Sequence, residues 1–231
     1  MIPNPHRCPC CKRQFKSIMR LSLCLLCFAA ALTAQANDWP ASGHDNARTA
    51  AAEEPLRLPL RQAWVHWAAQ PPSPAWPAAA RQDYWHKLLN LTPSVTYDRV
   101  FQVAAARGAV FFASSAGDEI CCLDAATGAR RWSFVTEGPV RLAPTLAGDK
   151  VLAGSDDGWV YCLAAADGTL AWRYRLGPRE ARLPGNGRMI SRWPVRTGIL
   201  VENGTGYCAG GLFPVTEGVY LAAFDVATGR E

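Results

Sequence analysis

The chain repeats one short segment three times, and this repetition limits its fold more than any other feature. Residues 121–132 read CCLDAATGARRW, residues 161–172 read YCLAAADGTLAW, and residues 222–231 read AAFDVATGRE. The first two copies lie 40 residues apart, counted from Trp132 to Trp172. Self-similarity at a fixed period is the signature of a repeat architecture.

Short apolar runs separated by Gly, Asp and Thr turns fill the spaces between these copies from residue 100 onward. Many short strands at a period near 40 are typical of four-stranded β-propeller blades. The sequence therefore predicts an all-β β-propeller over residues 100–231. Two whole repeats, most of a third and an N-terminal strand amount to an incomplete arc of about three to four blades, truncated at the C-terminus, where closure takes about four to eight.

Each copy combines a tight turn with a strand that carries tryptophan. Asp and Thr side chains can accept from and donate to the backbone of such a turn, and glycine supplies its positive φ. The tryptophan ring can pack against the neighbouring blade. These structural positions are Asp124, Thr127, Gly128 and Trp132 in the first copy, Gly168 and Trp172 in the second, and Asp225, Thr228 and Gly229 in the third.

Residues 1–36 have the pattern of a secretory signal peptide, with Met19 as an alternative start. A basic stretch ends at Arg20, an apolar run covers residues 21–32, and Ala34-Gln35-Ala36 gives the small-x-small cleavage pattern. The run is too short to be a permanent transmembrane helix. We expect a periplasmic or secreted protein with no membrane span after leader removal.

The charge balance argues against nucleic-acid binding. Five of the 24 Lys and Arg residues precede residue 21, and the remaining 19 equal the 19 Asp and Glu residues. A nucleic-acid partner needs a large surface that neutralises phosphate. Residues 37–99 read as a lead-in, with a strand at 62–67 and a linker at 70–77 that holds four prolines.

The pattern Asp-x-x-Thr-Gly-x-x-x-Trp at residues 124–132 resembles the tryptophan-docking repeat of pyrroloquinoline-quinone-type β-propellers. Residues 154–163, GSDDGWVYCL, resemble the strand pair of the same blade. The resemblance implies a family that includes quinoprotein dehydrogenases, which use pyrroloquinoline quinone and calcium. It also includes non-catalytic propellers, such as the lipoprotein of the outer-membrane β-barrel assembly machinery.

The resemblance favours a binding or assembly scaffold with protein partners in the cell envelope. The cofactor and calcium ligands of the dehydrogenases have no residue-by-residue match in this sequence, and we identify no catalytic or metal-binding residue. The alternative is a fragment of an oxidoreductase that uses pyrroloquinoline quinone and calcium. A third option is a ligand-binding sensor domain.

An arginine-rich stretch is the candidate for ligand binding. Residues 173–196 hold seven arginines and one acid, Glu180. Such a surface could bind a polycarboxylate or an acidic partner, or it could be a solvated strand face and loop. The candidate residues for a planar anionic ligand are Arg188, Arg192, Trp193 and Arg196. We expect loops at 177–188 and 209–214 to contain the insertion that lengthens the third repeat.

Two further motifs have simpler structural interpretations. Some quinoprotein dehydrogenases join adjacent cysteines in a disulfide, but Cys121 and Cys122 fall on an expected strand, where neighbours point to opposite faces. We expect them to fill the core as free thiols. Asp156-Asp157-Gly158 has oxygen ligands for calcium but reads as a hairpin turn.

Overall fold

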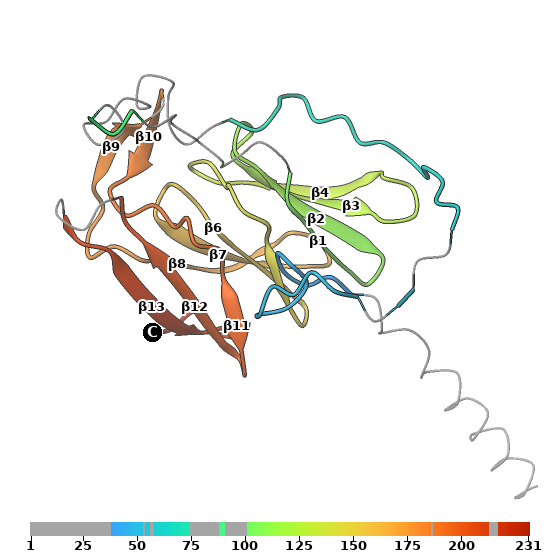
Figure 1. Ribbon diagram of the computed structural model, residues 1–231. Helices are drawn as coiled ribbons and strands as arrows, with labels where there is room; N and C mark the ends of the chain where they lie inside the picture. The colour runs from blue at the N-terminus through green and yellow to red at the C-terminus, as the bar shows by residue number, and fades with distance from the viewer. Residues whose placement is uncertain are drawn as a thin grey trace, which may run out of the picture. The chain divides into compact units, whose positions relative to one another are not determined.

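The computed structural model describes residues 38–52, 54–55, 58–73, 88–90, 101–185, 187–212 and 217–231. The predicted signal peptide at 1–36 and much of the predicted proline-rich linker lie outside these residues. The described residues form three antiparallel sheets and one separate hairpin (Figure 1).

The sheets follow one another along the chain, and each has its strands in sequence order. The first sheet consists of β1 (Val103–Ala106), β2 (Ala109–Ser114), β3 (Glu119–Asp124) and β4 (Arg130–Val135). The second consists of β5 (Thr145–Ala147), β6 (Lys150–Gly154), β7 (Trp159–Ala164) and β8 (Leu170–Arg175). The hairpin is β9 (Arg182–Gly185) and β10 (Arg188–Ser191), and the third sheet is β11 (Leu200–Glu202), β12 (Thr205–Gly210) and β13 (Tyr220–Asp225).

The first two sheets are copies of one another in their details. The pairing of the third and fourth strands shifts register between Cys122 and Leu123, and again between Cys162 and Leu163. An extra residue at a bulge increases the local twist of a strand pair. The equal position of this irregularity confirms that the 40-residue sequence period is a structural period.

Side chains alternate between the two faces of each sheet and so build a continuous core between sheets. Ile120 and Cys122 of the first sheet pack with Tyr161 and Leu163 of the second. Their neighbours along β7, such as Val160, face the other way and pack with the third sheet. Because successive strand residues point to opposite faces, one strand can contribute to both cores.

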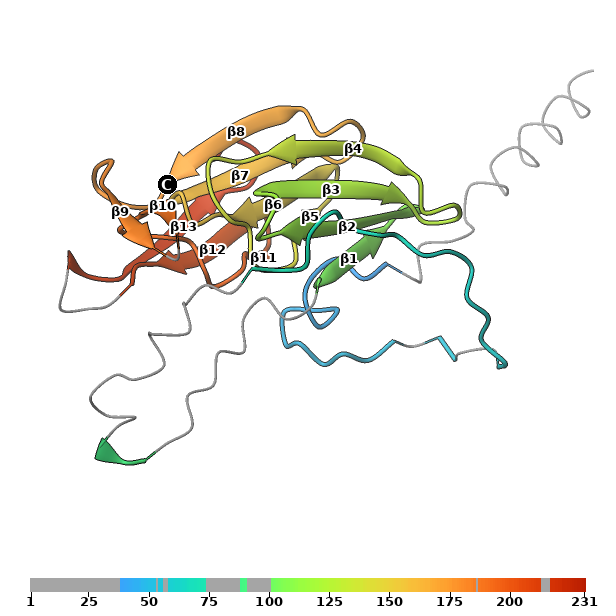
Figure 2. The same ribbon diagram turned by 90° about the horizontal axis from the view of Figure 1, so that it is seen from above.

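The first strands of the three sheets share the residue 38–50 segment as a common neighbour (Figure 2). Trp39 forms an antiparallel bridge with Ala105 of β1, and Pro40 accepts from the amide of Leu146 in β5. Asn46 donates its side-chain N–H to the carbonyl of Val201 in β11, at 2.9 Å. Residues 38–50 therefore contact the first strand of each of the three sheets, β1, β5 and β11.

The prediction of an all-β fold with repeated antiparallel sheets is confirmed. Two expectations need correction. Within residues 177–188 the structure has the β9 strand and the start of β10, because the segment pairs with itself as a hairpin. The strand expected at 62–67 has no hydrogen-bonded partner strand in the described part of the chain.

Candidate functional site

The repeated turn residues form the same hydrogen bonds in the first and third copies. Asp124 Oδ1 accepts from the amide and hydroxyl of Thr127, both at 2.9 Å. Asp225 Oδ1 accepts from the same two groups of Thr228, both at 2.7 Å. Hydrogen bonding lowers the pKa of Asp124 to about 2. The hydrogen bond from the Arg131 guanidinium is the largest cause, and those from Thr127 are the next largest. These residues therefore shape the turn with an ionised carboxylate.

The tryptophan of the first copy lies on the turn glycine of the second copy, and the tryptophan of the second lies on that of the third. Trp132 donates its indole N–H to the carbonyl of Ala165 at 3.0 Å, and its ring lies 2.6 Å from the place of a Cβ on Gly168. Trp172 donates to Val226 at 3.1 Å and covers Gly229 in the same way. Glycine is required because a larger residue would overlap the ring.

Trp64 makes the same pair of contacts, although it lies outside the three repeated segments. Its indole N–H donates to the carbonyl of Ala125 at 2.9 Å, and its ring lies 2.6 Å from the place of a Cβ on Gly128. The signal was present in the sequence, because an aromatic ring follows each of Trp64, Trp132 and Trp172 two residues later.

The arginine-rich stretch includes the β9–β10 hairpin, and carboxylates from distant parts of the chain surround it. Glu137 pairs with both Arg173 and Arg182, while Glu217 pairs with both Arg179 and Arg192. The neighbouring arginines lower the pKa of Glu137, with Arg182 as the largest cause. Glu137 is thus ionised, and Glu137 and Glu217 are each shared between two guanidiniums.

The four predicted ligand-binding residues are each engaged with protein groups. Arg188 donates to the carboxylate of Asp118 and to the carbonyl of Ala116. Trp193 is 1% exposed, and its ring lies 2.4 Å from the place of a Cβ on Gly177. A planar ligand therefore cannot stack on that ring face, and the predicted role of these residues stays a prediction.

Arg192 and Arg196 complete the predicted set, and they lie in different surroundings. Arg192 pairs with Glu217 and is partly exposed. Arg196 donates to both carboxylate oxygens of Asp156 at 2.6 and 2.7 Å, and Arg141 donates to the same carboxylate at 2.7 Å. Asp156 is 0% exposed, so this Arg141–Asp156–Arg196 cluster is buried.

The Asp156-Asp157-Gly158 motif is the hairpin turn between β6 and β7. Arginines satisfy Asp156, and Asp157 accepts from the Tyr161 hydroxyl at 2.7 Å and from the backbone of Trp159 at 2.9 Å. Burial raises the pKa of Asp157. Among the residues that the structure describes, no group of three or more His, Cys, Asp or Glu side chains is arranged to hold a metal ion.

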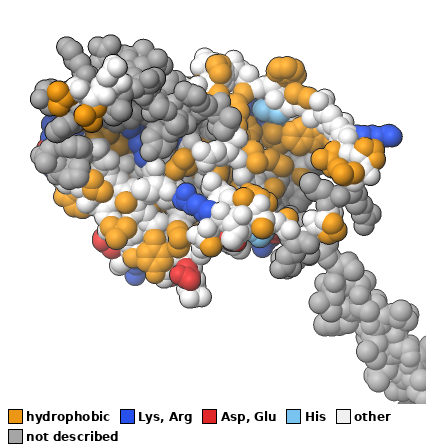
Figure 3. All heavy atoms as spheres, in the orientation of Figure 1, with side chains coloured by type: hydrophobic (Ala, Val, Ile, Leu, Met, Phe, Trp, Pro, Cys, Tyr) orange, Lys and Arg blue, Asp and Glu red, His pale blue; other side chains and the backbone are white. Residues whose placement is uncertain are grey.

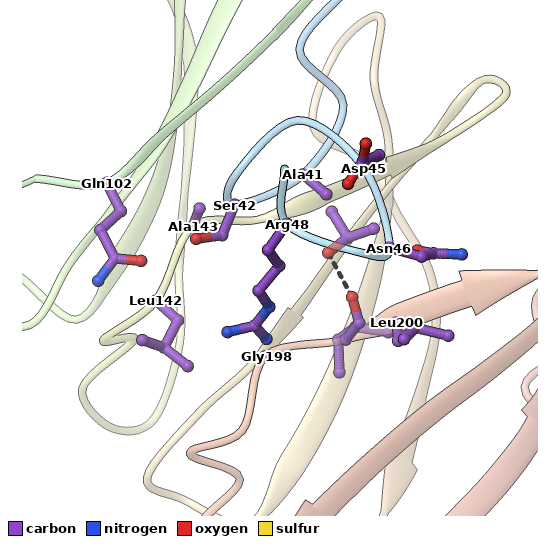
Figure 4. Close-up of a pocket in the computed structure, with 12 residues that line it drawn as sticks. Ala41, Ser42, Asp45, Asn46, Arg48, Gln102, Leu142, Ala143, Gly198 and Leu200 are labelled. Carbon is purple, nitrogen blue, oxygen red and sulfur yellow. Dashed lines mark hydrogen bonds between the residues drawn. The ribbon is translucent and has the colours of Figure 1, made fainter. Parts of the chain in front are cut away.

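A pocket of about 250 Å³ lies between residues 38–50 and the first strands of the second and third sheets. In Figure 4 the Arg48 side chain extends into it beside Leu142 and Gly198. The Thr145 hydroxyl donates to the carbonyl of Ile199 at 2.6 Å and closes one wall.

The cysteines of the sheets are free and buried: Cys121, Cys122, Cys162 and Cys208. Cys122 faces the second sheet and Cys121 the opposite side, which confirms the expected core-filling placement. Burial raises the pKa of Cys122 from 9.0 to about 11 and the pKa of Cys208 to about 12.

We therefore expect these four thiols to resist alkylation in the native protein. A pKa shift of two lowers the thiolate fraction about 100-fold, and only the thiolate reacts. Intact-mass measurement of the leader-free chain after iodoacetamide treatment should show no adduct near neutral pH, and four adducts in denaturant. Reduction should leave the mass unchanged, whereas a gain of two mass units would reveal a disulfide.

The stacked sheets and their common turn define a β-propeller repeat protein. A protein-family model described as "Outer membrane protein assembly factor BamB" matches residues 77–231, about two thirds of the chain. The chain belongs to this family of PQQ-like repeat proteins. No curated protein matches it.

Solved structures that match part of the chain include two dehydrogenases and BamB. Quinohemoprotein alcohol dehydrogenase from Comamonas testosteroni is 20% identical with a TM-score of 0.53, over 88% of this chain and 28% of that one. Quinohemoprotein alcohol dehydrogenase ADHIIG from Pseudomonas putida HK5 is 19% identical with a TM-score of 0.48, over 56% of this chain and 19% of that one. BamB from Moraxella catarrhalis is 21% identical with a TM-score of 0.29, over 53% of this chain and 44% of that one. The chain thus spans less than half of each of these proteins.

Proposed function

We propose that this protein is an exported β-propeller scaffold that binds an acidic protein partner in the cell envelope through its arginine-rich insertion. The family match supports a role in assembly, and the leader pattern at residues 1–36 supports export. No helix among the described residues is long and apolar enough to cross a membrane. The observation that carries the proposal is that the arginine-rich stretch, residues 173–196, has more guanidinium groups than carboxylates around it.

This surface holds six arginines and four carboxylates among the described residues; five of the arginines pair with a carboxylate, and Arg175 does not. The arginines are Arg173, Arg175, Arg179, Arg182, Arg188 and Arg192, and the carboxylates are Asp118, Glu137, Glu180 and Glu217. A carboxylate shared by two guanidiniums neutralises only one of them. The surface therefore keeps a positive charge that an acidic partner could match.

The shape of the insertion also suits partner binding. Its hairpin lies outside the three sheets, so its outward side is not needed to build their cores. Met189 on β10 is 53% exposed, which places an apolar side chain among the arginines. Arginine next to apolar surface is typical of protein interfaces, and insertions in repeat proteins often line the binding face.

Charge reversal on this surface should weaken binding of an acidic probe. Arg175 lies 5.6 Å from the Trp159 ring, and no carboxylate among the described residues pairs with it; Arg179 is 58% exposed. We expect the Arg175→Glu/Arg179→Glu variant to bind a fluorescent glutamate-rich peptide roughly tenfold more weakly at low salt. Fluorescence anisotropy measures this binding.

Arg130→Glu is the matched control, because Arg130 is an exposed arginine on β4 of the first sheet. It should change the affinity less than about twofold, as expected for an isolated surface charge. Equal weakening by both variants would show non-specific attraction. Unaltered binding by the Arg175→Glu/Arg179→Glu variant would exclude the insertion as the binding surface.

The dehydrogenase alternative is tested on the same purified protein. We expect no dye-linked alcohol or sugar oxidation after addition of pyrroloquinoline quinone and calcium. Sustained turnover that requires both additions would overturn the scaffold proposal in favour of an oxidoreductase. Quinone binding without turnover would favour the ligand-binding sensor.

A further inference from the structure

A second pocket, of about 170 Å³, lies between the first and second sheets, at the end where the β1–β2, β5–β6 and β7–β8 turns lie (Figure 1). One wall is formed by Ala109 and Phe111 of β2. The other wall is formed by Leu146 of β5 and by Ala165 and Ala166 of the β7–β8 turn. We call this pocket the turn-end groove.

The turn-end groove has apolar walls and a small volume. Ala109 and Phe111 are 4% and 2% exposed and belong to the core between the first two sheets. Sites that hold a whole drug-sized ligand span about 300–1,000 Å³. A volume of about 170 Å³ is too small for such a ligand, and it therefore suits a single apolar side chain.

The groove is hollow because small residues stand at two places. Ala109 is the first residue of β2, and the first residue of β6 is Lys150. Ala165 accepts an indole N–H through its carbonyl, and the residue that does so in the turn of the third sheet is Val226. Val226 is 7% exposed and packs in the core between the second and third sheets. Larger side chains therefore stand at both places in the next groove along the chain.

An arginine without an ion-pair partner lies on the rim of the groove. In the part of the chain that the structure describes, the Arg107 guanidinium pairs with no carboxylate, and Asp38 instead accepts the backbone amide of Arg107 at 3.2 Å. Arg131, by contrast, donates to Asp124 at 2.7 Å and to the carbonyl of Gly108 at 2.9 Å. The groove thus combines apolar walls with a guanidinium that is available to an anion.

The opposite rim carries an acid whose charge is offset. Among the described residues that line the groove, Asp149 is the one carboxylate, and it lies 3.4 Å from the Lys150 ammonium. Its side chain is 83% exposed. Charges this exposed are screened by salt and contribute little to binding. Arg107 is therefore the charge on the rim that has most to gain from a partner.

The groove is distinct from the other exposed surfaces of the molecule. Figure 3 shows hydrophobic side chains gathered over the region of β12 and β13, but these lie on one sheet, whereas two sheets form the walls of the groove. The arginine-rich insertion contacts Asp118, which lies in the β2–β3 turn at the other end of β2. A strand rises about 3.3 Å per residue, so the two ends of a six-residue strand such as β2 are roughly 17 Å apart.

We propose that the turn-end groove binds a segment of a partner protein in which an aliphatic side chain stands next to an acidic one. The aliphatic side chain enters the pocket beside Phe111, and the carboxylate pairs with Arg107. Charge complementarity selects this partner, because a basic or neutral segment would leave the Arg107 guanidinium without an anion. An apolar anchor in a pocket with a polar rim is the usual arrangement of a protein interface. This site and the arginine-rich insertion are separate, so either can bind a partner without the other.

Fluorescence anisotropy with three labelled peptides tests the proposal on the purified chain. The peptides share a Gly-Ser frame and carry Leu-Glu-Glu, Ser-Glu-Glu or Leu-Lys-Lys at the centre. We expect the Leu-Glu-Glu peptide to bind at least about tenfold more tightly than the Ser-Glu-Glu peptide, the effect of burying one leucine side chain. It should also bind at least about tenfold more tightly than the Leu-Lys-Lys peptide at low salt, because the lysines of that peptide lie beside Arg107.

Filling the groove should remove the preference for leucine. Ala165→Val introduces the side chain that Val226 has at the same place in the next groove. We expect this variant to bind the Leu-Glu-Glu peptide roughly tenfold more weakly and the Ser-Glu-Glu peptide as before. Ala171→Val is the matched control, because Ala171 is an exposed alanine of β8 outside the groove. It should change neither affinity by more than about twofold.

Arg107→Glu tests the charged part of the site without repacking the core, because Arg107 is exposed. This variant should bind the Leu-Glu-Glu peptide roughly tenfold more weakly at low salt. The Arg175→Glu/Arg179→Glu variant should keep the preference for the Leu-Glu-Glu over the Ser-Glu-Glu peptide, since its substitutions lie on the insertion.

Four results would overturn the proposal. They are equal affinity for the Leu-Glu-Glu and Ser-Glu-Glu peptides, tighter binding of the Leu-Lys-Lys peptide, equal losses from Ala165→Val and Ala171→Val, and no binding of any peptide up to about 1 mM. Thermal unfolding followed by circular dichroism shows whether each variant is folded. If Ala165→Val does not fold, the comparison of peptides and the Arg107→Glu variant still decide the outcome.

Discussion

Replacing Trp132 with alanine should lower the free energy of unfolding by about 3–5 kcal/mol, the range for large buried aromatic residues. The ring is 9% exposed and lies 5.9 Å from the Phe111 ring, in the core between the first two sheets. Its removal leaves a cavity over Gly168, which has no side chain to fill it. The variant also leaves the carbonyl of Ala165 without its donor.

Trp67→Ala is the matched control, because the Trp67 side chain is 86% exposed. It should change stability by less than about 0.5 kcal/mol. Urea unfolding followed by far-ultraviolet circular dichroism measures both variants. Similar losses for the two variants would contradict a special role for the tryptophan–glycine contact between sheets.

The architecture was predictable because the turn is chemically local. Asp124, Thr127 and Gly128 lie within five positions of one another, so their hydrogen bonds depend on spacing that the sequence displays. The tryptophan that follows at a fixed interval marks the next strand. A 40-residue period in such units leaves few alternatives to stacked four-stranded sheets.

The electrostatics of the arginine-rich stretch were not predictable in the same way. Counting charges along residues 173–196 finds one acid, but the structure brings Asp118 and Glu137 to this surface. Asp118 lies 70 residues before its partner Arg188. Pairs this distant in sequence depend on how successive sheets stack, which local patterns do not specify.

Residues 61–68 are a third case: their aromatic and β-branched residues can be read from the sequence, but their contact with the first sheet cannot. The aromatic and β-branched composition predicts a strand, but the structure has none at residues 62–67, because composition cannot identify a partner strand. Only the contact between Trp64 and Gly128 relates the segment to β4 and β8. The place of a segment in a repeat protein thus depends on its contacts with the neighbouring sheet as much as on its own amino-acid composition.

The buried cluster around Asp156 leads to the second large prediction. Asp156 is 0% exposed, and the side chains of Arg141 and Arg196 are 5% and 17% exposed. The cluster joins the loop before β5, the β6–β7 turn and the segment that leads to the third sheet. Removing one partner of a buried ion pair leaves a charge in a medium of low polarity, which costs far more than the pair contributes.

We therefore expect Asp156→Ala to lower the free energy of unfolding by about 3–5 kcal/mol, because two guanidiniums lose their common carboxylate. Asp149→Ala is the control, since the Asp149 side chain is 83% exposed and lies 3.4 Å from Lys150. It should cost less than about 0.5 kcal/mol. Urea unfolding compares the two, and raising the salt concentration should leave the Asp156→Ala loss nearly unchanged, because buried pairs are screened weakly. A loss for Asp156→Ala no larger than that for Asp149→Ala would mean that water replaces the carboxylate, and the cluster would then be no structural tie between the sheets.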